Sequence, residues 1–375
     1  MFRLQKTEPF FRFFRSILFS LFLVCGNKGL KMKIGLVGYS GSGKSSLFKW
    51  LSGVDPDPSA VNSSQSAMVM IPEPRIQALC EIYKPKKITY ASMEIVDTPG
   101  LNRDHTGNVS KLAHLREADY LVCLVPAFDG AKIDEEMQAF KEDMILADLE
   151  IALHRLEKID EQLKRHLPKD DLDKLQIEKD ALTIIRERLE EGNPILAEEM
   201  SDDHYKATRS FRFLTEKRAM VFVNAGDDET DFEQFQAHAT SKEPVLAASI
   251  GLELELDKMP PEEANSFCEE MGVSRVGRDG VIRSLMDHSG QMVFLTAGDK
   301  EVRSWLMTKN GTALEAAGRI HSDFIKKFIR CEVIACDDLV RLGGEREVKA
   351  AGLNHRENKD YVVQEGDVLL FHIAS

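Results

Sequence analysis

A glycine-rich loop near the start of the chain has the composition and spacing of a phosphate-binding site. Residues 38–45 follow the pattern G-x-x-x-x-G-K-S and lie between the apolar runs KIGLVG and LFKWL. Glycines let consecutive backbone N–H groups face phosphate oxygens, and the positive end of a following helix strengthens this field. Lys44 is expected to reach the β- and γ-phosphates, and Ser45 to bind Mg²⁺. The expected nucleotide contacts here are Gly38, Ser40, Gly41, Ser42, Gly43, Lys44, Ser45 and Ser46.

A second element of the same kind follows in MEIVDTPG, where an apolar strand ends on Asp97 and Gly100 lies three residues further on. A carboxylate at this place can hold Mg²⁺ through water, and the Gly100 N–H can contact a γ-phosphate. Asp97 alone would also suit a turn at the end of a strand. Together with the loop at 38–45, it favours a nucleotide site with Ser45 and Asp97 as the metal-binding residues.

Short apolar runs separated by helix-like stretches are expected to position these loops. KIGLVG, ASMEIVDTPG, YLVCLVPAF and RAMVFVNAG alternate with helical patterns, which predicts a parallel sheet with helices on both faces. Residues 137–211 differ, because apolar residues recur there every three or four positions and Pro168 interrupts them. We expect two antiparallel helices inserted in the α/β domain, and their leucines favour a helix–helix seam over a binding groove.

From about residue 291 the chain turns to short alternating runs around one helix, which predicts a small β-rich module with its own core. The expected division is therefore an N-terminal extension at 1–31, a nucleotide-binding domain at 32–136 and 212–290, a helical hairpin at 137–211, and the module at 291–375. A length of 375 residues with 43% hydrophobic content is enough for two or three domains.

Charge and cysteine content restrict the class of protein. The 49 Lys and Arg residues against 62 Asp and Glu give a net charge of −13, which argues against a general affinity for polyanions but permits a local basic patch. Six cysteines without C-x-x-C spacing favour a reduced, cytoplasmic protein. We expect a monomer without stable membrane insertion.

The first 31 residues include FFRFFRSILFSLFLVCG, an apolar run that follows arginines in the outline of a signal peptide. The run is short for a membrane span, and no small-residue cleavage site follows it. We expect translation to begin at Met32. A membrane-associating arm and a working signal peptide remain as alternatives.

The residues expected to contact the base follow RAMVFV, where Asn224-Ala225-Gly226-Asp227 stands at the position of the Asn-Lys-x-Asp motif of GTP-binding domains. Asp227 can accept hydrogen bonds from guanine, but the lysine that supports the base plane is absent. Ala248, in the string LAAS, lies where a last base-contacting loop is expected, although an ordinary turn would look the same. These residues leave ATP and GTP both open.

Several strings resemble the YchF or Obg-like ATPase family from about Met32 to the C-terminus. They are MIPEPRIQALCEIYKPKKITYASMEIVDTPGL, DMILADLEIALHRLEKIDEQLKR, FLTAGDKEVRSWLMTKNGTALEAAGRIHSDFIKKFIRCEVIACDD and KDYVVQEGDVLLFHI. The resemblance implies a Ras-like P-loop NTPase sheet with an inserted helical hairpin and a C-terminal ubiquitin-like β-grasp TGS domain. It also implies ATP preferred over GTP, ribosome association linked to translation or stress response, and an apolar residue, here Leu101, in place of a water-orienting glutamine.

The chain departs from the family pattern at a few positions. Asp227 stands where the family has Glu, and Gly41 where it usually has the Asn that can bind potassium. No threonine is evident for the first switch, where Ser63, Ser64 and Ser66 are the available hydroxyls. His105, in the loop after Gly100, is the candidate for handling the attacking water, although a loop histidine is often idle.

A basic cluster lies in the C-terminal module, comprising Arg319, Lys326, Lys327 and Arg330. It suits contact with ribosomal RNA, and equally a solvated helix face. We expect a cytoplasmic ATPase of low intrinsic rate whose nucleotide state orders the loops around Ser63 and Leu101. The alternative is a nucleotide-sensing protein that binds ATP or GTP with little turnover, and a transport ATPase is disfavoured.

Overall fold

The computed structural model describes residues 32–58, 63–128, 130, 132–195, 200–240, 243–273 and 275–374. The expected N-terminal extension at 1–31 lies outside the described residues. The described chain divides into two compact units, one formed by residues 32–69 and 93–289, the other by residues 70–92 and from Gly290 onward. Among the described residues, no helix combines the length and the apolar character needed to cross a membrane.

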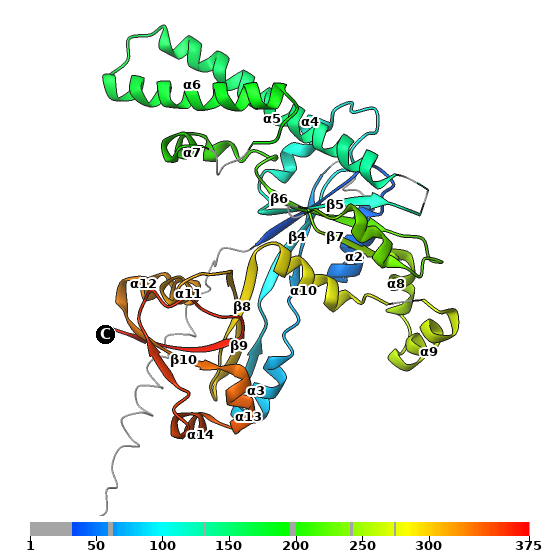
Figure 1. Cartoon of the computed structure of the whole chain (residues 1–375), viewed down its shortest axis with the longest axis vertical. Coiled ribbons are helices and arrows are strands. Elements are labelled where there is room, and N and C mark those ends of the chain that lie inside the picture. Colours follow the sequence, from blue (N-terminus) through cyan, green and yellow to red (C-terminus); the bar gives the residue numbers. More distant parts are fainter. Residues whose placement is uncertain are drawn as a thin grey trace, which may run out of the picture. The chain divides into compact units, whose positions relative to one another are not determined.

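The first unit contains a six-stranded sheet in the order β2-β4-β1-β5-β6-β7 (Figure 1). Neighbouring strands from β4 through β7 pair in parallel, which confirms the parallel sheet expected from the apolar runs. The strands are β1 (Lys33–Val37), β2 (Gln65–Met70), β4 (Ser92–Asp97), β5 (Tyr120–Pro126), β6 (Arg218–Asn224) and β7 (Val245–Ala248).

Helices cover both faces of this sheet, because the central strands carry apolar residues on both faces. One core joins Leu121, Cys123 and Val125 of β5 to Phe140 and Met144 of the helix that follows it. The opposite face packs against α2, which in turn contacts α8 and α10. The helices of this unit outside the hairpin are α2 (Lys44–Ser52), α4 (Asn108–Leu112), η3 (Ala113–Leu115), η6 (Phe232–His238), α8 (Ile250–Leu256), α9 (Pro261–Met271) and α10 (Arg278–His288).

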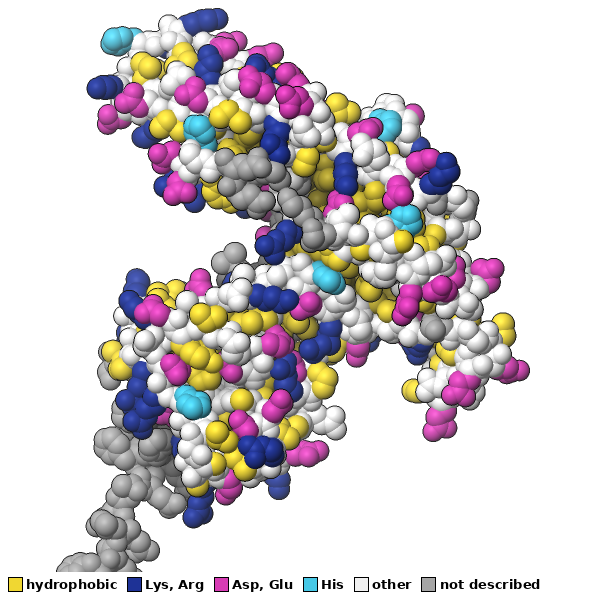
Figure 2. All heavy atoms as spheres, in the orientation of Figure 1, with side chains coloured by type: hydrophobic (Ala, Val, Ile, Leu, Met, Phe, Trp, Pro, Cys, Tyr) yellow, Lys and Arg dark blue, Asp and Glu magenta, His cyan; other side chains and the backbone are white. Residues whose placement is uncertain are grey.

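The inserted hairpin consists of α5 (Ile133–Leu163) and α6 (Lys169–Glu190), followed by α7 (Asp202–Thr208) and η5 (Arg209–Phe211) (Figure 1). The leucine-rich positions form one apolar seam between the two long helices, as the spacing predicted. Arg155 of α5 forms a bidentate salt bridge with Glu178 of α6, at 2.7 and 2.8 Å. Figure 2 shows acidic and basic side chains interspersed over the hairpin, which is typical of solvated helix faces.

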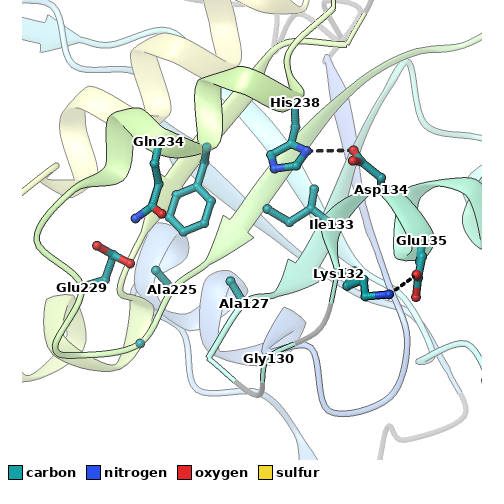
Figure 3. Close-up of a pocket in the computed structure, with 12 residues that line it drawn as sticks. Ala127, Gly130, Lys132, Ile133, Asp134, Glu135, Ala225, Glu229, Gln234 and His238 are labelled. Carbon is teal, nitrogen blue, oxygen red and sulfur yellow. Dashed lines mark hydrogen bonds and ion pairs between the residues drawn. The ribbon is translucent and has the colours of Figure 1, made fainter.

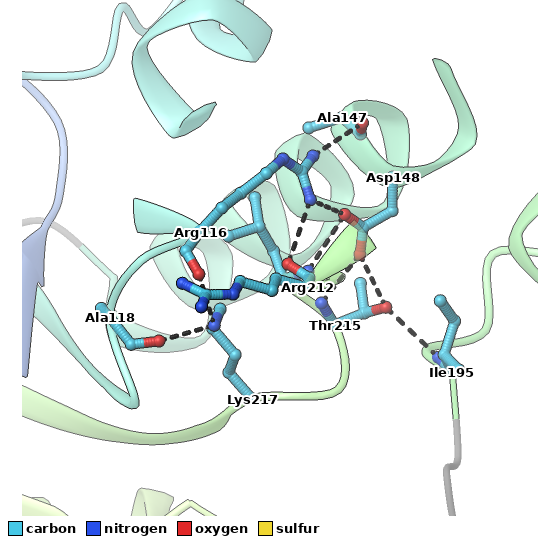
Figure 4. Close-up of polar contacts among 9 residues, drawn as sticks. Arg116, Ala118, Ala147, Asp148, Ile195, Arg212, Thr215 and Lys217 are labelled. Carbon is cyan, nitrogen blue, oxygen red and sulfur yellow. Dashed lines mark hydrogen bonds and ion pairs between the residues drawn. The ribbon is translucent and has the colours of Figure 1, made fainter. Parts of the chain in front are cut away.

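The base of the hairpin is held by a fully buried carboxylate, Asp148 of α5 (Figure 4). It accepts hydrogen bonds from the Arg116 guanidinium at 2.8 Å, from the backbone of Leu214 at 3.0 Å, and from the backbone and hydroxyl of Thr215, both at 2.9 Å. A buried charge is tolerated only where charged and polar partners surround it. Asp148 thus joins α5 to the segments that precede β5 and β6.

The second unit contains a second six-stranded sheet, in the order β11-β10-β12-β8-β9-β3, around a core that includes Phe294, Trp305 and Phe371. Its helix α11 begins with a capping box between Thr312 and Glu315. The strands are β3 (Lys87–Thr89), β8 (Gln291–Thr296), β9 (Glu301–Thr308), β10 (Phe328–Ala335), β11 (His355–Glu357) and β12 (Asp367–Ile373). The helices are α3 (Arg75–Tyr83), α11 (Ala313–Ile320), α12 (Ser322–Lys327), α13 (Cys336–Leu342) and α14 (Glu345–Ala350).

The segment at 70–92 groups with the C-terminal module rather than with the nucleotide-binding domain, where the sequence analysis placed it. Its strand β3 pairs in parallel with β9, and the Ala91 N–H donates to the Ser304 hydroxyl at 2.7 Å. Arg75 binds Glu73 at 2.6 Å and Glu365 at 2.8 Å. Apart from Glu73, these partners are more than two hundred positions away in sequence, so local patterns do not indicate the grouping.

Candidate functional site

The loop at 38–45 joins β1 to α2 in a conformation that depends on its glycines, as Gly38 and Gly43 show. A Cβ at Gly38 would lie 2.6 Å from the Leu124 carbonyl oxygen. Gly43 has a φ of 96°, and a Cβ there would collide with the Asn224 side chain. The loop is therefore packed directly against the ends of β5 and β6. The next residue begins α2, so the helix N-terminus and its free N–H groups lie at the loop.

Lys44 lies inside this loop rather than in solvent, with 7% of its surface exposed. Burial lowers its pKa, and the nearby Asp97 acts in the opposite direction. An ammonium group held in a poorly solvated site interacts strongly with an anion that approaches it. The position suits the phosphate contact expected of Lys44.

The side chains of Ser45 and Asp97 contact each other at the end of the loop. The Ser45 hydroxyl donates to Asp97 Oδ2 at 2.8 Å, while Asp97 Oδ1 is buried and has no hydrogen-bond partner among the described residues. A buried carboxylate oxygen without a partner is costly unless a cation or water satisfies it. Oxygen ligands of this kind suit Mg²⁺, so the residues present fit the expected metal.

Gln65, at the start of β2, is a neighbour of Asp97 that the sequence analysis missed. Its Nε2 donates to Asp97 Oδ2 at 3.3 Å, and its Oε1 accepts from the Asp57 backbone at 3.0 Å. The hydroxyl residues expected at this place are Ser64 and Ser66, on either side of Gln65, together with Ser63. The sequence does not point to a glutamine here, because the residue expected to cover Mg²⁺ is a threonine.

The loop that follows β4, which begins around Gly100 and Leu101 and is the second of the two expected switch loops, is attached to the phosphate loop through the backbone. Ser40 N donates to the Leu101 carbonyl at 2.9 Å, and Leu101 N donates to the Gly38 carbonyl at 3.1 Å. The Leu101 side chain is 1% exposed and packs in the core beside Tyr39. A Cβ at Gly100 would lie 3.2 Å from Lys44 Nζ, so Gly100 passes close to the expected phosphate position. The Leu101 side chain itself cannot orient a water molecule.

Asn224, at the end of β6, holds the phosphate loop in place. Its Nδ2 donates to the Ser42 carbonyl at 3.2 Å, and its Oδ1 accepts from the Ile250 backbone at 3.3 Å. Both polar atoms of this buried side chain are engaged within the chain, and the base contact expected of Asn224 stays a prediction. Ser46, on the first turn of α2, is exposed.

The rest of the expected base-contacting segment lies at the carboxyl ends of β6 and β7. Ala225 N donates to the Ala248 carbonyl at 3.1 Å, and both residues are buried. Asp227 is exposed, and its Oδ1 accepts from the Ser249 hydroxyl at 2.8 Å and from Leu252 N at 3.1 Å. Asp227 therefore caps the N-terminus of α8. Its carboxylate is partly committed before any base binds.

A pocket of about 530 Å³ lies beside this segment, where β5 and β6 end (Figure 3). Ala225 and Gly226 form one part of its lining, and the start of α5 another. Its charged groups are largely paired with each other, as in the 2.8 Å contact between His238 and Asp134 and the 2.6 Å contact between Lys132 and Glu135. The pocket extends the carboxyl edge of the sheet, where ligands of α/β proteins bind.

His105 lies on the loop after Gly100 and is held by the hairpin. Its Nδ1 lies 2.8 Å from Asp143 Oδ1 on α5, and its ring meets the Tyr39 ring edge-on with 6.4 Å between the centroids. Tyr39 belongs to the phosphate loop. The structure thus brings His105 beside that loop, together with Asp143, which no sequence pattern indicates because it lies 38 positions further along the chain.

The basic cluster lies in the second unit. Arg319 ends α11, Lys326 and Lys327 end α12, and Arg330 is on β10. The last three are exposed, as are the apolar side chains of Ile325 and Ile329 among them. The surface therefore combines positive charge with exposed aliphatic groups.

Comparisons with known proteins find similarity over most of the chain. A family model described as a 50S ribosome-binding GTPase matches residues 33–170, and one described as YchF-GTPase_C, a protein of unknown function, matches residues 292–374. The chain is 30% identical to the ribosome-binding ATPase YchF of Bacillus subtilis over 370 residues, which covers 91% of this chain and 99% of that protein.

A plant relative and a solved structure extend the comparison. Obg-like ATPase 1 of rice (Oryza sativa subsp. japonica) is 29% identical over 375 residues, which covers 93% of each chain. The structure of the Schizosaccharomyces pombe YchF GTPase superposes with a TM-score of 0.73 at 24% identity and covers 92% of this chain and 99% of that chain. The latter supports the expected P-loop fold with its helical insertion.

Proposed function

The chain belongs to the YchF and Obg-like ATPase family, and from this premise we propose that it is a P-loop ATPase of low turnover that associates with the ribosome. The observation that carries the proposal is the Ser45–Asp97 pair, whose second carboxylate oxygen is buried without a partner beside the phosphate loop. The ribosome is proposed as the partner because the Bacillus subtilis relative is named a ribosome-binding ATPase.

The backbone of residues 38–45 surrounds the phosphates, and the N-terminus of α2 faces them with its positive end. Lys44 neutralises the charge that develops on the β- and γ-phosphates. Because burial already lowers the Lys44 pKa, an approaching phosphate stabilises the charged ammonium form. Gly100 leaves room for the γ-phosphate, since any side chain there would crowd Lys44.

Ser45 and Asp97 are the residues that would hold Mg²⁺, Ser45 directly and Asp97 through water. When bound, this ion neutralises phosphate charge during transfer. Gln65 Nε2 orients the Asp97 carboxylate from the side of β2, at 3.3 Å. Gln65 has a serine on each side, Ser64 and Ser66. Residues 63–66 are therefore the part of the first switch, the loop before β2, that we place beside the metal site.

We assign water handling to His105, since Leu101 is buried and carries no polar group. Histidine can accept a proton at physiological pH, and positioned histidines commonly contribute to hydrolysis. The buried Leu101 also favours the second candidate, a nucleotide sensor with little turnover. Turnover itself distinguishes the two.

ATP is the proposed nucleotide. Adenine presents one acceptor and one donor, which backbone groups at 225–226 and near Ala248 can satisfy. Guanine is read best by a carboxylate with both oxygens available, and one oxygen of Asp227, Oδ1, already accepts from Ser249 and Leu252. A modest preference for ATP follows.

The surface proposed for ribosome contact is the basic cluster at Arg319, Lys326, Lys327 and Arg330. Lysine and arginine neutralise RNA phosphates with release of counterions, so this contact weakens as salt rises. Because the proposed partner is the ribosome, we place the protein in the cytoplasm.

The test is phosphate release by the full chain with Mg²⁺ and ATP, with and without ribosomes, beside co-sedimentation at two salt concentrations. We expect slow ATP-dependent release that Lys44→Ala abolishes, and ribosome binding that Lys326→Glu with Lys327→Glu weakens. Nucleotide binding without release above the Lys44→Ala level would favour the sensor instead.

A further inference from the structure

Asp143 is a buried carboxylate on α5 that contacts both loops of the nucleotide site. Its Oδ2 accepts from the Tyr39 hydroxyl at 2.9 Å and from Asn108 Nδ2 at 2.8 Å, and its Oδ1 lies 2.8 Å from His105 Nδ1. The residue is 2% exposed. One side chain of the hairpin is thus joined to the phosphate loop and to the loop after Gly100.

The donors around Asp143 determine which nitrogen of His105 carries the proton. The Asn108 amide nitrogen can only donate. Burial, together with the hydrogen bond to Asp143, raises the pKa of Tyr39 well above its usual range, so its hydroxyl also keeps its proton. A carboxylate accepts only, hence neutral His105 donates from Nδ1 and keeps a lone pair on Nε2.

The loop that carries His105 is held in a conformation that local preference opposes. His105 has a φ of 63°, in the left-handed region that non-glycine residues rarely adopt. Asn108 stabilises it by accepting from Asn102 N at 2.8 Å and donating to the Asn102 carbonyl at 2.9 Å. Strained backbone that persists only through surrounding contacts is a common feature of functional sites.

We propose that Asp143 is a positioning residue for ATP hydrolysis, which fixes His105 in the Nδ1–H tautomer so that its Nε2 accepts a proton from the attacking water. The inference rests on the proposed function, since it assumes that His105 handles this water. A proton passes from water to Nε2 as the water oxygen bonds to the γ-phosphorus and the bond to the bridging oxygen of ADP breaks. The proton later leaves Nε2 to solvent or phosphate.

The variant Asp143→Asn separates this role from packing. Two donors, Tyr39 and Asn108, face Oδ2, so the asparagine oxygen is retained there and its NH₂ group faces His105 Nδ1. Nδ1 then becomes the acceptor, and His105 adopts the opposite tautomer with Nε2 protonated. A similar exchange beside a catalytic histidine leaves geometry intact but lowers the rate strongly.

The tautomer is measured directly by ¹⁵N spectra of histidine-labelled full chain at alkaline pH, with His105 assigned from His105→Gln. The parent should show a protonated Nδ1 and an unprotonated Nε2, a result that needs no substitution at Asp143. Asp143→Asn should exchange the two signals. An Nε2-protonated His105 in the parent overturns the proposal.

Activity provides the second measurement. Asp143→Asn should lower kcat for ATP at least tenfold and leave ATP affinity within twofold, since general base catalysis is worth about 10²-fold or more. In the His105→Gln background the same change should alter kcat less than twofold. Equal loss in both backgrounds would mean that Asp143 acts through packing alone, which contradicts the proposal.

Asp148→Asn is the matched control, because Asp148 is an equally buried carboxylate five residues further along α5 whose partners lie outside the two loops (Figure 4). It should lower thermal stability but keep the parent tautomer and, below the unfolding temperature, the parent kcat. A parent without phosphate release would overturn the proposed function rather than the Asp143–His105 contact, which the ¹⁵N spectrum still decides.

Discussion

Ser45 and Asp97 are 52 positions apart in the chain, yet the Ser45 hydroxyl donates to Asp97 Oδ2 over 2.8 Å. The contact forms because β1 and β4 are parallel neighbours, so the loop after each strand emerges at the same edge of the sheet. The other Asp97 oxygen remains buried without a partner in the described chain. This relationship is the structural basis for the proposed metal and nucleotide site.

Lys44→Ala should abolish ATP binding and leave the fold intact. The lysine lies in the phosphate loop and neutralises phosphate charge, but its side chain is not part of an apolar core. Isothermal titration calorimetry with ATP measures the change in affinity, and circular dichroism checks the fold. Lys49→Ala is the control, since Lys49 lies on the same helix and pairs with Asp55 near the surface. Equal ATP affinity for parent and Lys44→Ala would contradict the phosphate-loop assignment.

Asn224→Ala should weaken ATP and GTP alike, because Asn224 holds the Ser42 carbonyl and the start of α8 rather than a base. We expect a loss of about 1–3 kcal/mol in unfolding free energy, the cost of leaving buried polar groups without partners. Titration of both nucleotides and urea unfolding measure the two effects. A loss confined to one nucleotide would show that Asn224 recognises the base.

ATP should bind better than GTP by less than tenfold, which corresponds to about 1.4 kcal/mol. Asp227 keeps guanine tolerable, while the absent lysine and the bonds to Ser249 and Leu252 reduce its benefit. Asp227→Asn should weaken GTP selectively and leave ATP nearly unchanged. A parent that binds GTP at least as tightly as ATP, with Asp227→Asn removing that affinity, would reverse our choice of nucleotide.

Arg75→Ala should destabilise the unit formed by residues 70–92 and 290–374. Arg75 neutralises Glu73, whose side chain is fully buried, and also binds Glu365. Removing one partner of a buried charge pair costs about 3 kcal/mol or more. The loss of stability is measured by thermal unfolding of Arg75→Ala beside the control Arg346→Ala, a change at an exposed position on α14. Equal unfolding temperatures for the two variants would show that Arg75 does not hold the segment in place.

The pH dependence of stability should report on Glu332 in the second unit. The hydrogen bond from His372, assisted by one from Asn354, lowers the pKa of Glu332 to about 2. A depressed carboxyl pKa stabilises the fold above the unfolded value, and this contribution is lost as pH falls from about 5 towards 2. Glu332→Gln should therefore unfold at a lower temperature than the parent at pH 7, with the difference shrinking below pH 4. A difference independent of pH would refute this assignment.

The strand runs, the phosphate loop and the helical hairpin were predictable from sequence because each depends on local spacing. Leu156 and Leu182, for example, lie in the seam that their periodicity indicated. The grouping of β3 with β9 and the positions of Gln65 and Asp143 were not predictable. They depend on contacts between residues tens to hundreds of positions apart, which no local pattern specifies. The contacts of Asn224 within the chain were not predictable for the same reason, since its partners Ser42 and Ile250 are not its neighbours in sequence.

Mg²⁺-dependent phosphate release from ATP by the full chain, measured beside Asp97→Asn, tests the central claim most directly. We predict slow release in the parent that requires Mg²⁺, and a loss of at least tenfold in the variant, because a neutral amide cannot replace the charge with which the carboxylate holds the metal and its water. Unchanged release in Asp97→Asn, or release that persists without a divalent cation, would contradict the assignment of Ser45 and Asp97 as the metal and nucleotide site.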